Sequence, residues 1–263
     1  MNLFKFYSLF ILFFLFNGKN ANACDCSIPN VLDHIRESDF IAVAKINSLS
    51  LDTENSNRHN AEIEILKLYK GKPIKEIKVW SLLNSSCSFL PDEGSLWLIF
   101  STKNYEGILG FGFCSGAILL DEEFDKKKKT INTKDFYDKT GFRLQVLDFL
   151  PKSKLKRENK AGLYISTSDE YLSGYRGSEI EGDRFALYEL SIDTNLSIEA
   201  IKPIKEFTFS SSNGSLIPHL KQDLKVWSKD QEKTIAKPQK MIIAIYYYPA
   251  EGEYESFLSL FDL

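Results

Sequence analysis

The sequence predicts a mainly β protein, with a five-stranded barrel on the N-terminal side and a smaller α+β domain after it. Two observations predict this fold. Segments of strand length, rich in Ile, Val, Leu and aromatic residues, recur through residues 40–113 between turn-forming Asn, Gly, Pro and Ser. Apolar and charged residues also alternate within them, as in Glu62-Ile63-Glu64-Ile65, which is typical of a strand with one buried face.

The five barrel strands are expected where these segments occur. A short helix is predicted before the first of them, over Pro29–Glu37. The expected strands are Phe40–Leu49, Asn60–Tyr69, Lys75–Leu82, Ser95–Ser101 and Gly107–Phe113.

The composition is that of a folded chain with room for two domains. Its 263 residues are 43% hydrophobic and 26% charged, and 14 Gly and 8 Pro are too few for a low-complexity protein. The net charge is -3 at pH 7. A nucleic-acid-binding protein usually carries a basic surplus, so we expect no nucleic-acid partner.

Residues 1–23 have the features of a secretory signal peptide. Lys5 precedes an apolar stretch over Phe6–Phe16, which is shorter than the roughly 20 residues of a transmembrane helix. Ala21-Asn22-Ala23 then offers the small residues that a signal peptidase requires. We therefore expect a secreted, periplasmic or cell-envelope protein without a transmembrane anchor, whose mature chain begins at Cys24.

A lipid anchor is the alternative at this position. A cysteine directly after the cleavage site is also the acylated residue of lipoproteins. Ala21 stands where lipoprotein signals usually have Leu, and acylation would consume the sulfur of Cys24 that a disulfide needs. The sequence therefore favours an N-terminal cysteine without a lipid and leaves lipidation at Cys24 as the second possibility.

The even number of cysteines predicts two disulfides in an exported chain. The four are Cys24, Cys26, Cys87 and Cys114. A bond between Cys24 and Cys26 would close a ring too tight for normal disulfide geometry. Each of these two residues therefore pairs with Cys87 or Cys114, and both arrangements stay open on the residues alone.

Metal and catalytic readings of the cysteines have less support. A structural zinc site needs four ligands at compact spacing, and His34, His59 and His219 do not complete such a set. Gly112-Phe113-Cys114-Ser115-Gly116 has the spacing of a nucleophile elbow, but Ala117–Leu120 and the acidic residues after it indicate a strand and turn instead of the required helix. We expect no cofactor, no catalytic residues and no enzymatic activity.

Several short motifs occur in a recognisable order between residues 24 and 116. The motifs are Cys24-Asp25-Cys26-Ser27-Ile28-Pro29, Ser38–Ile46, Leu68-Tyr69-Lys70-Gly71, Ser86-Cys87-Ser88-Phe89 followed by Asp92–Phe100, and Cys114-Ser115-Gly116. Together they resemble the netrin-like domain of the tissue inhibitor of metalloproteinases type, over residues 24–125. The resemblance implies an OB-type barrel with disulfides Cys24–Cys87 and Cys26–Cys114.

The resemblance also implies a binding mode. In those inhibitors the α-amine and carbonyl of the first Cys chelate the zinc of a metalloprotease, and the second residue enters the adjacent pocket. This assigns zinc chelation to Cys24 and the pocket to Asp25, with Cys26, Ser27, Ile28 and Pro29 as flanking contacts. Asp25 departs from the usual Thr or Ser, and an unpaired carboxylate is costly to desolvate. The sequence thus predicts a non-enzymatic binding protein with a protein partner or, alternatively, a metalloprotease inhibitor.

The second half begins with a change of composition. Residues 126–160 are expected to hold a basic turn at Lys126–Lys129, a helix over Asp135–Leu150 that ends before Pro151, and a polar linker.

A separate α+β domain is expected over residues 161–263. Its order of elements faintly resembles the carboxy-terminal domain of TonB-type proteins, whose membrane helix and proline-rich spacer this chain lacks, so no role is assigned to this domain. Tyr246–Tyr248 are expected to be mainly core residues, and Phe257–Leu263 a docked tail. The expected elements are a hairpin of Arg184–Ile192 and Ser197–Phe209, a helix over Leu216–Ser228 and a strand over Lys240–Tyr248.

Overall fold

The computed structural model describes residues 24–120, 141–150, 162–167, 172–210, 214–228 and 234–260. The expected signal peptide at 1–23, the basic turn at 126–129 and the linker at 152–160 lie outside these residues, as does the first part of the predicted helix at 135–150.

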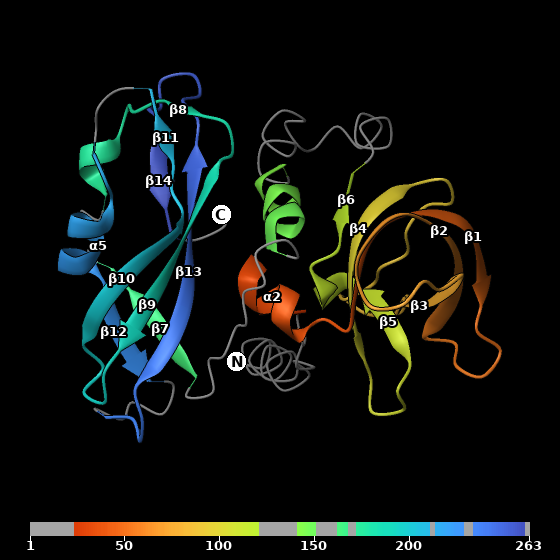
Figure 1. Ribbon diagram of the computed structural model, residues 1–263. Helices are drawn as coiled ribbons and strands as arrows, with labels where there is room; N and C mark the ends of the chain where they lie inside the picture. Colours follow the sequence, from red (N-terminus) through yellow and green to blue (C-terminus); the bar gives the residue numbers. More distant parts are fainter. Residues whose placement is uncertain are drawn as a thin grey trace, which may run out of the picture.

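The N-terminal half is a closed five-stranded mixed β-barrel, consistent with an OB-type fold (Figure 1). The strand order is β1-β2-β3-β5-β4, and pairing of β1 with β4 closes the barrel. β3 and β5 run parallel, whereas the other neighbours are antiparallel. The strands are β1 (Phe40–Leu51), β2 (Arg58–Lys70), β3 (Glu76–Trp80), β4 (Leu96–Lys103) and β5 (Leu109–Gly112), and the short β6 (Ile118–Leu119) pairs with β4.

The predicted alternation selects the barrel core. Ala61 and Ile63 are buried, whereas Glu62 and Glu64 between and beside them are exposed. All five predicted strands are confirmed to within a few residues. β3 stops at Trp80, before the predicted end at Leu82, because Leu82 has a left-handed backbone with φ 42° that a strand cannot contain.

Gly110 provides the space for a tryptophan on the outer face of the barrel. A Cβ atom at Gly110 would lie 2.4 Å from Cε2 and Cζ2 of the Trp80 indole. Gly110→Ala should therefore lower the free energy of unfolding by about 1–3 kcal/mol, measured by urea denaturation, because the ring or the strand must shift. Gly174→Ala, with no atom within 4 Å of the new methyl group, is the matched control. The penalty should disappear in a Trp80→Leu background, and its persistence there would contradict the proposed clash.

Two helices lie between the barrel and the C-terminal sheet (Figure 1). The first is α2 (Val31–Glu37), whose N-terminus is capped by the side chain of Asn30. Lys70 Nζ donates to the last carbonyls of α2, at Ile35 and Arg36, and so ties the helix to the barrel. The predicted helix Pro29–Glu37 is confirmed.

The second helix covers residues 141–150 and contacts both halves of the protein. Phe142 and Val146 pack against the C-terminal sheet, whereas Leu144 and Leu147 pack against the outside of the barrel. The described part of the predicted helix over 135–150 is thus confirmed, and its two apolar faces hold the halves together.

The C-terminal half is built on a four-stranded sheet in the order β10-β9-β13-β14. The predicted hairpin of β9 and β10 and the predicted strand over Lys240–Tyr248 are confirmed. Tyr246 and Tyr247 are buried, and β14 pairs with β13, so the described part of the predicted tail does dock. The four strands are β9 (Phe185–Ile192), β10 (Ile198–Lys205), β13 (Gln239–Tyr248) and β14 (Phe257–Ser259).

Among its described residues, this half also contains two smaller sheets and two short helices. Residues 208–209, which we predicted as the end of the hairpin strand, pair instead with residues 180–181. The elements are β7 (Leu163–Ser166), η2 (Ser173–Tyr175), β8 (Ile180–Glu181), β11 (Thr208–Phe209), α5 (Ile217–Asp223) and β12 (Lys225–Ser228).

The predicted helix over Leu216–Ser228 is wrong in its second half. The helix α5 ends at Asp223, and residues 225–228 form strand β12, paired with β7. Burial alternates along β12, with Val226 and Ser228 inside and Lys225 and Trp227 outside. This period of two is that of a strand, and four residues are too few for it to be distinguished from a helical turn in the sequence.

Candidate functional site

The segment Cys24–Pro29 is attached to one end of the barrel by both disulfides. Cys24 bonds Cys87 in the β3–β4 loop, and Cys26 bonds Cys114 in η1 (Phe113–Ser115), which follows β5. The Cα–Cα distances of 5.2 and 5.1 Å are normal for disulfides. The pairing that the family resemblance implies is therefore confirmed.

The disulfides leave no cysteine thiolate for another reaction. The sulfur atoms of Cys24, Cys26 and Cys114 lie within 4.8 Å of one another, which is close enough for ligands of one metal ion. All four cysteines of the chain are, however, in disulfides, and the thiolate is the form that binds a metal or acts as a nucleophile. In this oxidised state the cysteines crosslink the site and do not form a metal centre.

The attached segment presents one side to solvent. Cys24, Cys26 and Pro29 are half-buried, whereas Asp25 and Ser27 are exposed. Ile28 is also exposed, at 48%. The two cysteines thus attach this segment to the barrel, while Asp25 between them is exposed. We call Cys24–Pro29 the strap.

His34 of α2 packs between Phe100 of the barrel and Gly116, which also lies beside Ile28 of the strap. Its ring stacks on Phe100 with centroids 3.9 Å apart. Gly116, which has φ 65°, lies so close that a Cβ there would be 2.6 Å from His34 Cε1 and 3.0 Å from Ile28 Cγ2. Burial lowers the pKa of His34 to about 4, although a hydrogen bond with the Ser115 backbone opposes this. His34 is therefore a neutral packing residue at physiological pH.

The other two histidines do not join this site. His59 Nδ1 lies 2.8 Å from Ser81 Oγ, and His219 packs edge-on against Tyr175 in the C-terminal half.

The β3–β4 loop adds exposed apolar residues beside the strap. Phe89 N–H donates to Ser81 carbonyl and closes the loop, while the Phe89 ring packs inward on Trp97 and Phe111. The segment Cys24–Pro29, the β3–β4 loop and η1 are joined by the two disulfides, and we call these three segments the stapled edge. Its exposed apolar side chains are Ile28, Leu82, Leu83, Leu90 and Phe113.

Sequence reasoning found the strap but missed the rest of the stapled edge. Leu82 was assigned to a strand, and Phe113 to the end of another. The available signal was the pair Leu82-Leu83 immediately before the turn-forming Asn84-Ser85-Ser86, where two apolar residues have no strand partner.

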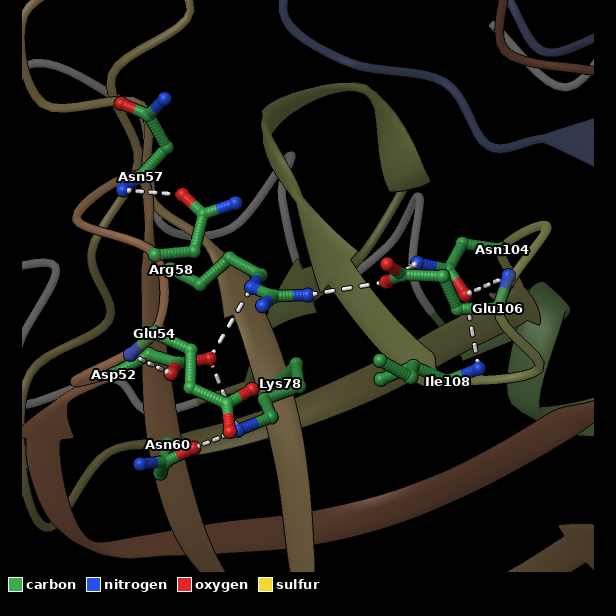
Figure 2. Close-up of polar contacts among 10 residues, drawn as sticks. Asp52, Glu54, Asn57, Arg58, Asn60, Lys78, Asn104, Glu106 and Ile108 are labelled. Atoms are coloured by element: carbon green, nitrogen blue, oxygen red, sulfur yellow. Dashed lines mark hydrogen bonds and ion pairs between the residues drawn. The ribbon is translucent and has the colours of Figure 1, made fainter.

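A cluster of charged residues on the outside of the barrel joins two of its turns (Figure 2). Asp52 Oδ2 lies 3.1 Å from both Arg58 Nε and Lys78 Nζ, and Arg58 Nη1 is 3.3 Å from Glu106 Oε2. Two cations thus face two carboxylates. Asp52 Oδ1 also accepts a hydrogen bond from the Glu54 backbone N–H, and the Glu106 backbone N–H donates to Asn104 Oδ1 within its own turn. A charge-balanced cluster of this kind holds the β1–β2 and β4–β5 turns together.

This cluster should make stability depend on pH. A hydrogen bond from the Glu54 backbone N–H is the main reason why the pKa of Asp52 lies below its ordinary value. A hydrogen bond from Lys78 lowers this pKa further. A carboxylate with a depressed folded-state pKa stabilises the protein above its unfolded pKa of about 4, and this contribution is lost as the pH falls through the folded-state value. Asp52→Asn should destabilise the protein at pH 7, and the difference from the original protein should shrink below about pH 4.

Chemical denaturation from pH 7 to pH 3 measures this effect. Glu199→Gln, at an exposed position on β10, is the control and should leave the curve unchanged. A constant difference between Asp52→Asn and the original protein across the whole range would contradict the assignment.

Comparison with other proteins adds no assignment. None of the protein-family models that were compared matches this chain, and no curated protein sequence is significantly similar to it. Within the described residues, no helix has the length and hydrophobicity that crossing a bilayer requires. Two disulfides are typical of proteins in extracellular or periplasmic spaces.

Proposed function

We propose that this chain is an exported, non-enzymatic binding protein whose netrin-like N-terminal domain engages a protein partner through the stapled edge. The observation that carries the proposal is the crosslinking of the strap to the β3–β4 loop and η1, which leaves their apolar side chains exposed. Disulfides hold these segments in place before binding, so little conformational entropy is lost on association. Exposed Leu, Ile and Phe side chains that lie together are typical of a surface that contacts another protein.

The resemblance over residues 24–125 supports the same assignment. The disulfide connectivity and the closed barrel both agree with what a netrin-like domain requires. The resemblance to the tissue inhibitors of metalloproteinases implies that the strap corresponds to their inhibitory segment.

Charged substitutions on the stapled edge test the binding surface. Ile28→Asp, Leu83→Asp and Phe113→Asp each place a charge on the edge, and Leu66→Asp places one at an exposed Leu on β2. The partner is the protein that the purified original chain captures from the cell envelope or medium of its own cells. Capture should fail for the edge variants and persist for Leu66→Asp. Capture that survives all three edge substitutions would place the surface elsewhere.

Metalloprotease inhibition is the second candidate function. It is favoured by the position of Cys24, which is held by Cys87 while the neighbouring Asp25 side chain points to solvent. In a mature chain beginning at Cys24, the α-amine and the Cys24 carbonyl would then be fixed for chelation of the target's zinc. An α-amine with a pKa of about 8 loses its proton readily to a metal ion.

Adding one alanine before Cys24 distinguishes the two functions. The insertion moves the amine away from the zinc and should abolish inhibition of a metalloprotease, whereas capture through the stapled edge should persist. N-terminal sequencing and intact mass of the exported protein should show Cys24 as the first residue and two disulfides. A lipid on the sulfur of Cys24 would exclude the Cys24–Cys87 disulfide that fixes the amine, and an acyl group on the amine itself would exclude chelation.

A further inference from the structure

A cleft of about 1000 Å³ opens in the C-terminal half, far along the chain from the stapled edge. Three elements form its walls: the β7–β12 ribbon, the helix α5 and the turn between β9 and β10. Figure 1 shows α5, β10 and the ribbon grouped in the same part of this half. The volume is at the upper end of the range for small-molecule sites.

The outer face of the β7–β12 ribbon carries the aromatic wall. Trp227 and Tyr164 are directly paired across the two strands, and each is about half exposed, at 48% and 47%. The indole Nε1 donates to Ser166 Oγ at 2.6 Å, which fixes the orientation of the ring. The inner face of the same ribbon, with Leu163 and Val226, packs into the core. The two half-exposed rings therefore lie side by side at the surface, and the hydrogen bond to Ser166 orients the indole of Trp227.

The opposite wall is a rigid turn with polar groups. Asp193 Oδ1 accepts hydrogen bonds from the backbone N–H groups of Asn195 and Ser197. Leu196 between them has φ 64°, a conformation that is unfavourable for a residue with a side chain. Backbone strain of this kind is often found at binding sites. The side chains of Asn195 and Ser197 line the cleft and offer donors and acceptors.

The charge of the lining residues is positive. Lys221 of α5 and Lys225 of β12 are both exposed and line the cleft, and no acidic residue is among its described lining residues. Ammonium groups beside aromatic faces favour a ligand that combines a flat apolar surface with a carboxylate.

We infer that this cleft binds an acidic saccharide, a short oligosaccharide that carries carboxylate groups. The C–H face of a sugar ring stacks on Trp227 and Tyr164, and its hydroxyl groups bond to Asn195 and Ser197. The carboxylate pairs with Lys221 or Lys225. A polynucleotide is disfavoured for two reasons. The chain has a net charge of -3, and Lys221 and Lys225 are the only basic residues among the described residues that line the cleft.

Two matched pairs of probes test this inference on the full mature chain. Trigalacturonate is compared with its neutral methyl ester, and 3′-sialyllactose with lactose, by titration calorimetry and tryptophan fluorescence. At least one acid should bind more tightly than its neutral counterpart by about tenfold, and added salt should reduce the difference. Trp227→Ala should weaken binding by about tenfold or more, whereas Trp227→Phe should retain most of it.

The lysines and the controls complete the experiment. Lys221→Gln with Lys225→Gln should remove the preference for the acid, and Lys202→Gln, an exposed lysine of β10 outside the cleft, should leave it unchanged. Circular dichroism verifies that each variant is folded. Equal binding of acid and neutral probe, binding of an oligothymidylate alone, or no binding of any probe would each overturn the inference.

Discussion

Replacing Cys24 and Cys87 together by serine should lower the free energy of unfolding by about 4 kcal/mol. The bond joins residues 63 positions apart, and in the chain-entropy model a crosslink over such a loop removes much of the conformational freedom of the unfolded chain. Guanidinium denaturation of the oxidised protein measures the loss. The Cys26–Cys114 bond, with a separation of 88, should give a loss of similar size.

Reduction provides the control for this prediction. When both disulfides of the original protein are reduced, its unfolding midpoint should fall to that of a variant that lacks all four cysteines. A loss below about 1 kcal/mol for the Cys24–Cys87 variant would mean that the strap is already ordered by packing alone. The same variant should also fail to capture the partner, because the strap is then released from the β3–β4 loop.

Phe142→Ala should cost about 3–5 kcal/mol, because it removes a fully buried ring from the layer between the two halves. The Phe142 ring is 1% exposed and lies 4.5 Å from the Tyr246 ring, between centroids. The helix that carries it also packs on the barrel through Leu147. The loss should therefore appear in the unfolding of the C-terminal sheet and in its attachment to the barrel.

Hydrogen exchange locates this effect. In Phe142→Ala, amides of β13 should exchange faster, whereas those of β2, in the barrel core, should change little. Phe142→Leu, which keeps most of the volume, should cost less than about 1.5 kcal/mol. Equal acceleration in β2 and β13 would show that the two halves unfold as one unit.

Much of the barrel was predictable because its first two strands, β1 and β2, are long and have one buried face. In β2, Ala61 and Ile63 alternate with Glu62 and Glu64 over enough residues for a period of two to be recognised. The strap was also predictable, because Cys24 and Cys26 are too close in sequence to bond each other, and the chain has only two other cysteines, Cys87 and Cys114. The choice between those partners came from the family resemblance, and the structure agrees with it.

Other parts depended on contacts between distant segments. β12 has only four residues, and it becomes a strand because β7, about 60 residues earlier, supplies its hydrogen-bonding partners. Leu82 looks like a continuation of β3 in sequence, but the closed loop around Cys87 places it in a left-handed conformation. Local pattern contains no information on either pairing.

By itself the amino-acid sequence determined a mainly β fold, the barrel strands and a crosslinked N-terminal strap, because alternating burial and cysteine spacing are local properties. Only the tertiary structure decided that His34 is a half-buried packing residue, that Phe142 and Leu147 join two cores, and that Tyr164 and Trp227 share one face beside two lysines. Those positions result from which distant surfaces exclude water together, and this depends on the whole packed chain.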